Sequence, residues 1–183
     1  MSEANFITKT TLNGVMLINR PTFADDRGFF RESLRVKDLE SEIAKPFNIV
    51  QVNHARSSKG TLRGIHVAPW NKLIYVTHGK VQAVIVDLQK NSSTFGNYES
   101  FILGEETKNS LFVPAQCGNS YLVLSDDVDY TYLTDQEWAP GLEFNVAWND
   151  PELNVKWELD GEPILSEKDK QNPTLQSVFP DRT

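Results

Sequence analysis

Residues 62–72 read LRGIHVAPWNK and place an arginine, a histidine and a lysine within apolar sequence typical of buried strands. Charged side chains in such a setting cost desolvation free energy unless something requires them there. Imidazoles in general titrate near neutral pH, so His66 can remove a proton, whereas the ammonium of Lys72 can stabilise negative charge. These residue types indicate acid–base chemistry in a site lined by cations.

The local context of the three histidines singles out His66. Its strand is followed directly by Pro69, Trp70 and Asn71, and a strand end beside a loop is a common place for a site residue. His54 also stands at a strand end, where we expect a structural role. His78 precedes Gly79 in an expected hairpin turn, which predicts a surface position.

Spacing alone leaves the neighbours of His66 open. Arg63 lies three residues before it, so in a regular strand the two side chains point to opposite faces unless a bulge intervenes. Lys72 can return to His66 across a hairpin. Tyr132 is first interpreted as a core tyrosine, and Asp169, in the sequence LSEKD, as part of a helix-capping box.

Other chemistries lack their usual residues. His66 is followed by Val67 and Ala68 rather than by a second histidine, and neither a Cys-x-x-Cys pair nor a histidine cluster occurs, so we expect no metal site. Cys117 is the only cysteine, which excludes an intrachain disulfide and is typical of a small buried side chain. The sequence contains neither Gly-x-Ser-x-Gly nor a glycine-rich phosphate loop.

Composition indicates an ordinary globular protein. The chain has 183 residues, of which 39% are hydrophobic and 23% charged, so we predict one domain over residues 1–183 with a loosely held polar tail from about residue 172. The formal net charge of −7 disfavours nucleic-acid or anionic-membrane partners. No apolar run suits a membrane span and the N-terminus does not resemble a signal peptide, so we expect a cytoplasmic protein.

Short apolar or alternating runs, bounded by Gly, Pro, Asn, Asp or Ser, predict an all-β fold. In residues 80–88 both faces of the expected strand are apolar, which favours an interior strand of a double sheet. Helical spacing is weak and confined to residues 36–44 and 166–170. The sequence therefore predicts a jelly roll with a few short helices. The expected strands are 15–19, 29–33, 49–54, 61–66, 72–77, 80–88, 98–103, 110–113, 120–124, 128–134 and 144–147.

Five collinear stretches resemble the dTDP-4-dehydrorhamnose 3,5-epimerase family of nucleotide-sugar epimerases. They read FADDRGFFRES (23–33), QVNHARSSKGTLRGIH (51–66), KLIYVTHGKVQAVIVDLQKNSSTFGNY (72–98), VAWNDPELNVKW (146–157) and LSEKDKQNPTL (165–175). The resemblance implies a cupin-type jelly-roll barrel, a homodimer without metal or cofactor, and a nucleotide-diphosphate 4-keto sugar as substrate.

The same resemblance assigns roles to individual residues. His66 matches the general base and Asp169 the carboxylate that orients it. Lys72 matches the lysine that stabilises the enolate oxygen, and Tyr132 the tyrosine that delivers a proton from the opposite face. The predicted substrate contacts are Arg63, Gln51 and Asn53 for pyrophosphate and sugar, and Arg27, Phe30 and Glu32 for the nucleotide, the last three supplied by the partner subunit.

The sequence departs from the family pattern around the expected substrate. The usual RGLHYQ is RGIHVAP here, and the loop from His66 to Lys72 is short. Asn119 occupies the histidine position of the usual Gly-Phe-x-His-Gly-Phe and can bond a sugar hydroxyl but not shuttle a proton. Trp138 stands where a tyrosine is usual. The short loop and the sequence GNS also resemble a branch that acts on nucleotide-linked heptoses of capsules.

We therefore expect an epimerase that inverts C3, C5 or both in a nucleotide-activated 4-keto sugar through an enolate, for deoxysugar or surface-polysaccharide synthesis. Two alternatives remain at this point: a cupin 3,4-ketoisomerase, which moves the carbonyl, and a non-catalytic nucleotide-sugar binding module. The sequence leaves open whether the nucleotide is dTDP, GDP or CDP, and whether the sugar is a hexose or a heptose.

Overall fold

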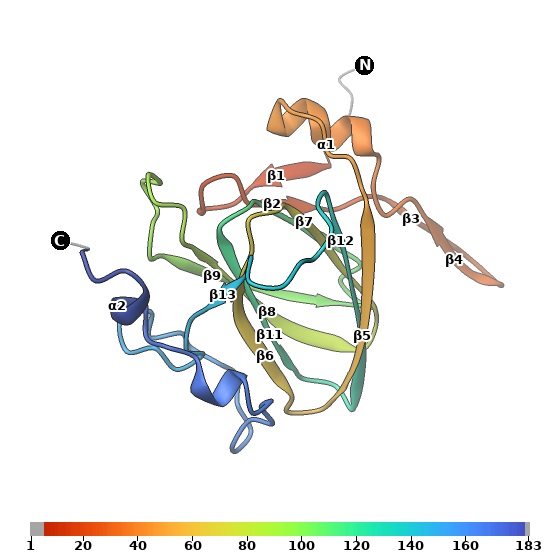
Figure 1. Cartoon of the computed structure of the whole chain (residues 1–183). Helices are drawn as coiled ribbons and strands as arrows, with labels where there is room; N and C mark the ends of the chain where they lie inside the picture. Colours follow the sequence, from red (N-terminus) through yellow and green to blue (C-terminus); the bar gives the residue numbers. More distant parts are fainter. Residues whose placement is uncertain (1–5, 182–183) are drawn as a thin grey trace.

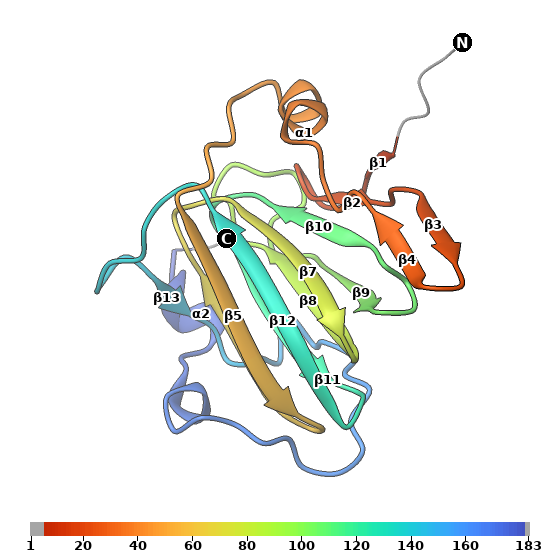
Figure 2. The same ribbon diagram turned by 90° about the vertical axis from the view of Figure 1, so that its right-hand side faces the viewer.

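A computed structural model describes residues 6–181 and consists mainly of two antiparallel sheets that face each other (Figures 1 and 2). The six-stranded sheet has the order β1 (Ile7–Lys9), β2 (Met16–Ile18), β10 (Ser110–Val113), β7 (Lys72–His78), β12 (Asp127–Thr134) and β5 (Gln51–Ser58). The five-stranded sheet has the order β13 (Phe144–Asn145), β6 (Leu62–Val67), β11 (Cys117–Val123), β8 (Lys80–Asp87) and β9 (Tyr98–Gly104).

The main core lies between the two sheets and follows from the alternation of side chains along each strand. On β8, Val81, Ala83 and Ile85 join this inner core, whereas Val84 and Val86 belong to a second apolar cluster on the outer side. The prediction of an interior strand buried on both faces is confirmed.

Each sheet is covered on its outside by a different part of the chain. Helix α1 (Val36–Ile43) covers one half of the six-stranded sheet, and its Leu39 is fully buried against Phe112 and neighbouring residues. The C-terminal segment, with the 3-10 helix η1 (Asp169–Gln171) and helix α2 (Leu175–Val178), covers the five-stranded sheet (Figure 1).

The expectation of a loosely held tail from about residue 172 is wrong for the described part of that tail. Leu175 is 1% exposed and packs into the outer cluster of the five-stranded sheet. Its backbone N–H donates to the carboxylate of Asp150 at 2.7 Å, and Thr174 caps α2 by accepting from the N–H of Ser177. One buried leucine and two caps therefore anchor a segment that is polar in composition.

A two-stranded arm, β3 (Thr22–Asp25) and β4 (Gly28–Arg31), projects from the barrel beside the six-stranded sheet (Figures 1 and 2). Phe23, Phe29 and Phe30 on this arm are 65%, 58% and 69% exposed. The sequence predicted β4, which contains the apolar pair Phe29 and Phe30, but missed β3 and the three-residue β1. No helix within residues 6–181 is long and apolar enough to cross a membrane.

Candidate functional site

A bulge in β6 brings Arg63 and His66 to the same face of the sheet. Across the β6–β11 pair, His66 lies opposite Asn119 and Arg63 opposite Tyr121, so three steps along β6 match two along β11. An extra residue in one strand shifts the side-chain alternation by one. The opposite-face arrangement expected for a regular strand is therefore replaced by the bulged alternative, and the side chains of Arg63 and His66 both point between the sheets.

Gly64 makes this bulge sterically possible. Its backbone φ is +129°, a value that L-residues with a side chain rarely adopt. A Cβ atom at this position would also clash with the side chain of Ser120. The Ser120 hydroxyl donates to the carbonyl of Arg63 at 2.7 Å, which fixes the bulge against β11. The glycine between Arg63 and Ile65 is thus a requirement of the site's geometry.

His66 is paired with Asp169 from the C-terminal segment. The His66 Nε2 lies 2.7 Å from Asp169 Oδ1, and the Asp169 side chain is only 4% exposed. Burial alone would raise the pKa of Asp169, but hydrogen bonds, chiefly with His66, hold that pKa below its usual value. The backbone N–H of Asp169 donates to Ser166 Oγ at 3.1 Å, which is one of the two bonds of the expected capping box. The box is not completed, because the Asp169 carboxylate bonds His66 and Asn172 and no side chain of the described residues caps η1.

Lys72 begins β7 and is 4% exposed. Burial lowers its pKa to about 8, against the opposing attraction of Glu143 and Cys117. Its ammonium has no hydrogen-bond partner among the described residues. A buried cation without a protein partner is costly and is typical of a group that serves a ligand.

Tyr132 lies on β12 opposite Asn53 of β5 and Ile74 of β7. It is half-buried and packs against the inner core, as the core interpretation expects, whereas its neighbour Tyr130 is completely buried. Burial and the nearby Glu143 raise the pKa of Tyr132, which keeps the phenol protonated at neutral pH. Tyr132 can therefore act as a proton donor.

The inner face of β5 supplies the two predicted amide contacts. Gln51 Nε2 donates to Asn53 Oδ1 at 2.7 Å, and Gln51 Oε1 accepts from the backbone N–H of Trp138 at 2.9 Å. Trp138 is 55% exposed, and its indole N–H donates to Glu143 at 3.1 Å. These contacts hold the loop after β12 against the mouth of the site.

Sequence reasoning missed Glu143, Ser57 and Tyr121. Glu143 interacts electrostatically with both Lys72 and Tyr132, yet an isolated glutamate in a polar loop gives no sequence signal. The Ser57 hydroxyl bonds Tyr121 Oη and accepts from Arg63 Nε, both at 3.2 Å. The alternation along β5 was the only indication that Ser57 faces inward.

The arm residues do not reach this site within one chain. Arg27 pairs with Asp25 at 2.6 Å at the tip of the arm, and Glu32 is held by Arg20 at 2.7 Å and by Arg35. Figures 1 and 2 show the arm directed away from the barrel interior. The nucleotide contacts assigned to Arg27, Phe30 and Glu32 therefore require a second copy of the chain.

The remaining titratable candidates lie elsewhere. His54 pairs with Asp129 at 2.8 Å and His78 lies between Glu105 and Asp127; both histidines are exposed, which matches their structural interpretation. Cys117 is buried, and burial raises its pKa to about 12. Within residues 6–181, no group of three or more His, Cys, Asp or Glu side chains is arranged to hold a metal ion.

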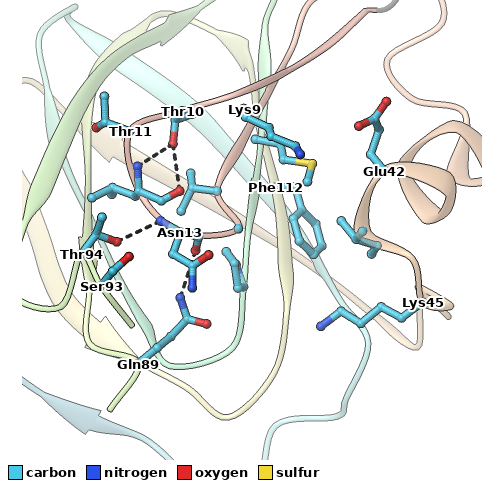
Figure 3. Close-up of a pocket in the computed structure, with 16 residues that line it drawn as sticks. Lys9, Thr10, Thr11, Asn13, Glu42, Lys45, Gln89, Ser93, Thr94 and Phe112 are labelled. Atoms are coloured by element: carbon cyan, nitrogen blue, oxygen red, sulfur yellow. Dashed lines mark hydrogen bonds between the residues drawn. The ribbon is translucent and has the colours of Figure 1, made fainter. Parts of the chain in front are cut away.

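A separate pocket of about 480 Å³ lies beside the turn between β1 and β2 (Figure 3). It is lined by polar groups that bond one another: the N–H of Asn13 donates to Thr94 Oγ1 and Gln89 Nε2 donates to the carbonyl of Asn13, both at 3.0 Å. None of the predicted site residues lines it. We assign it no part in the chemistry around His66.

Solved structures with the same architecture define the class of protein. The chain superposes with a TM-score of 0.89 and 33% identity on the crystal structure of dTDP-4-dehydrorhamnose 3,5-epimerase from Elizabethkingia anophelis, over 93% of this chain and 96% of that one. An epimerase from Legionella pneumophila, in complex with dTDP-4-keto-L-rhamnose, gives 0.90 and 32% over 96% and 95%. The double-sheet barrel is that of the cupin-type sugar-nucleotide epimerases, which confirms the predicted fold.

Sequence comparison specifies the family. Residues 9–177 match the family profile described as dTDP-4-dehydrorhamnose 3,5-epimerase. The Pseudomonas aeruginosa enzyme of that name is 40% identical over 167 residues, covering 90% of this chain and 92% of the relative. The Escherichia coli enzyme is 35% identical over 177 residues, covering 94% and 96%. The chain belongs to the dTDP-4-dehydrorhamnose 3,5-epimerase family and is an isomerase of the epimerase class.

Proposed function

We propose that this chain inverts C3, or both C3 and C5, of a dTDP-linked 4-keto-6-deoxyhexose by removing and returning a carbon-bound proton. The observation that carries the proposal is the His66–Asp169 pair, 2.7 Å apart, in a barrel that also buries Lys72, whose ammonium has no hydrogen-bond partner within residues 6–181. A base and a cation for the resulting anion are the two requirements of enolate chemistry.

Each step uses one of these side chains. Because Asp169 engages Nε2 of His66, the lone pair on Nδ1 is available to take the proton from the carbon beside the C4 ketone. The electron pair of the C–H bond moves onto the ketone oxygen, where the ammonium of the buried Lys72 stabilises the enolate, because charges attract more strongly when water is excluded. Tyr132 then delivers a proton to the other face of the carbon, and the ketone re-forms with the centre inverted.

The choice of nucleotide and sugar rests on relatives. The Legionella structure contains a dTDP-4-keto sugar, and a Streptomyces relative 36% identical over 159 residues is a dTDP-4-dehydro-6-deoxyglucose 3-epimerase. Relatives therefore include single and double epimerases, and both outcomes are within the proposal. Arg63 supplies local positive charge for the diphosphate in a chain whose net charge is −7. The proposed location is the cytoplasm.

The functional unit is proposed to be a homodimer whose sites are completed by the partner's arm. Phe23, Phe29 and Phe30 on the arm, together with Val50 and Val52 at the edge strand β5, are all more than half exposed. Exposed aromatic side chains on a projecting hairpin are typical of an interface. Sedimentation equilibrium should give a dimer, and Phe30→Ser should weaken both dimerisation and nucleotide binding; a monomeric wild type with full activity would refute shared sites.

The decisive experiment is incubation with dTDP-4-keto-6-deoxyglucose in deuterated water, followed by NMR. We expect deuterium at C3, or at C3 and C5, with the ketone still at C4. A carbonyl that moves to C3 would identify a ketoisomerase instead, and tight binding without exchange would identify a binding module. Parallel samples with GDP- and CDP-linked 4-keto hexoses and with a 4-keto heptose test the nucleotide and the capsular-heptose alternative.

A further inference from the structure

Tyr130 and Asn119 form a contact that crosses the barrel beside His66. Tyr130, on β12 of one sheet, donates its hydroxyl proton to Oδ1 of Asn119, on β11 of the other, at 3.0 Å. The Tyr130 ring is 1% exposed and stacks on Tyr121 with centroids 4.0 Å apart and an interplanar angle of 16°. Tyr121 is itself hydrogen-bonded to Ser57, so the ring against which Tyr130 stacks is held in place.

The burial of Tyr130 determines which way the Asn119 amide faces. A buried hydroxyl proton without an acceptor costs the desolvation of that group, and Asn119 Oδ1 is the acceptor it has among the described residues. Rotating the amide by half a turn would present an NH₂ group to the hydroxyl and leave its proton unsatisfied. The carbonyl oxygen of Asn119 is therefore held toward Tyr130, and the NH₂ group is held away from it.

The NH₂ group of Asn119 is left available beside the catalytic base. Asn119 lies directly opposite His66 in the β6–β11 pair, and directly opposed residues of antiparallel strands share a face. The Nδ2 atom of Asn119 has no hydrogen-bond partner within residues 6–181. It is not among the fully enclosed side-chain atoms without a partner in those residues, so it is not completely enclosed by protein. The two N–H donors of Asn119 are thus available to a ligand on the face that Asn119 shares with His66.

We propose that Tyr130 is a positioning residue that locks Asn119 as a hydrogen-bond donor to an oxygen substituent of the sugar. The inference rests on the proposed function for the identity of the ligand. It adds a specificity rule: the sugar position against Asn119 must carry a hydroxyl or ketone oxygen. An amino group there is protonated at neutral pH and can only donate, so the site rejects it.

Binding of unreactive ligands tests this separately from turnover. dTDP-glucose has a hydroxyl at C4 and cannot form the enolate, so its affinity reports recognition alone. We expect Tyr130→Phe and Asn119→Asp each to weaken dTDP-glucose binding by about tenfold, the usual effect of losing one hydrogen bond. Binding of dTDP, which lacks the sugar, should not change. In wild type, replacing the sugar hydroxyl that contacts Asn119 by an amino group should weaken binding at least about tenfold. Tyr130→Phe should reduce this difference in affinity between the hydroxyl and the amino sugar.

Tyr98→Phe is the matched control, because the Tyr98 hydroxyl accepts from the N–H of Lys156 on the outer side of the other sheet. It should bind both ligands as wild type does. The inference is overturned if Tyr130→Phe, shown to be folded by circular dichroism, binds dTDP-glucose as tightly as wild type does. It is also overturned if Tyr130→Phe weakens the binding of dTDP-glucose and of dTDP equally, or if wild type binds dTDP-glucose no more tightly than dTDP. Asn119→Asp gives the same readout should Tyr130→Phe fail to fold. A wild type that binds dTDP-glucose but incorporates no deuterium into dTDP-4-keto-6-deoxyglucose refutes the epimerase, not this contact.

Discussion

The imidazole of His66 and the carboxylate of Asp169 lie 2.7 Å apart although 103 residues separate them in the sequence. The contact exists because the C-terminal segment packs across the outer face of the sheet and η1 delivers Asp169 to the end of β6. A buried carboxylate whose pKa is held below its usual value by its hydrogen bonds fixes the tautomer and the orientation of the imidazole. The segment that looks least like catalytic structure in the sequence thus completes the proposed base.

The first prediction concerns His66→Ala, which removes the base. General base catalysis contributes roughly a hundred- to ten-thousand-fold, so deuterium incorporation from solvent should fall by about a thousand-fold at every centre. Asp169→Asn should cause a smaller loss, because the imidazole remains but its tautomer is no longer fixed. His54→Ala is the control, since His54 is exposed and pairs only with Asp129 at 2.8 Å among the described residues. Normal exchange in His66→Ala would remove His66 from the mechanism.

Most strands were predictable because their side-chain alternation and bounding turn residues are strong. The predicted 110–113 coincides with β10, and 72–77 and 128–134 each fall one residue short of β7 and β12. The strands that were missed, β1 and β3, are short or have no buried face, and helix α2 has only four residues. Local periodicity identifies an element best when one of its faces is buried; β4 has no buried residue and was predicted from its short apolar run instead.

The site was less predictable, for geometric reasons. His66, Lys72, Tyr132 and Asp169 were assigned through family resemblance, whereas the period-two rule alone would have separated Arg63 from His66. Only the bulge at Gly64 resolves that conflict, and a bulge is set by pairing with another strand. The contact between Tyr130 and Asn119 likewise depends on two sheets facing each other, which no local pattern encodes.

The pH dependence of turnover should reflect Lys72. Its pKa is lowered to about 8 by burial, so the ammonium that stabilises the enolate is largely present at pH 7 and disappears as the pH rises past 8. We expect kcat/KM for epimerisation to fall tenfold per pH unit above about pH 8. Lys72→Arg, which stays charged throughout this range, should lower the rate but flatten that limb. An unchanged limb in the variant would assign it to another group.

Tyr132→Phe should separate proton removal from inversion. The variant retains His66 and Lys72, so solvent deuterium should still enter the carbon on the original face, while the inverted product falls by at least about a hundred-fold. NMR distinguishes the two outcomes, because exchange without inversion gives deuterated starting sugar. Tyr98→Phe should leave both rates unchanged. Normal yield of the epimer from Tyr132→Phe would reassign the second proton to another acid.

Anchoring of the C-terminal segment can be tested with Leu175→Ala. Leu175 is 1% exposed, and truncating a buried leucine typically costs about 2–5 kcal/mol of the free energy of unfolding. We expect urea denaturation to show a loss in that range, with reduced activity because Asp169 lies on the same segment. Gln176→Ala, at the exposed neighbouring position, should change stability by less than about 0.5 kcal/mol. Equal stability of the two variants would mean that the segment is not part of the cooperative fold.

The last prediction is that Lys72 reduces stability in exchange for function. Its pKa is lower in the folded chain, about 8 against 10.5, so folding disfavours the ammonium. The penalty, on the order of 3 kcal/mol, is fully present below pH 8 and is relieved as the pH rises toward 10.5. Lys72→Met should therefore be inactive yet more stable than wild type at pH 7, with the difference shrinking above pH 8. Lys59→Met, at an exposed position, should not show this dependence; a Lys72→Met variant less stable than wild type at pH 7 would contradict it.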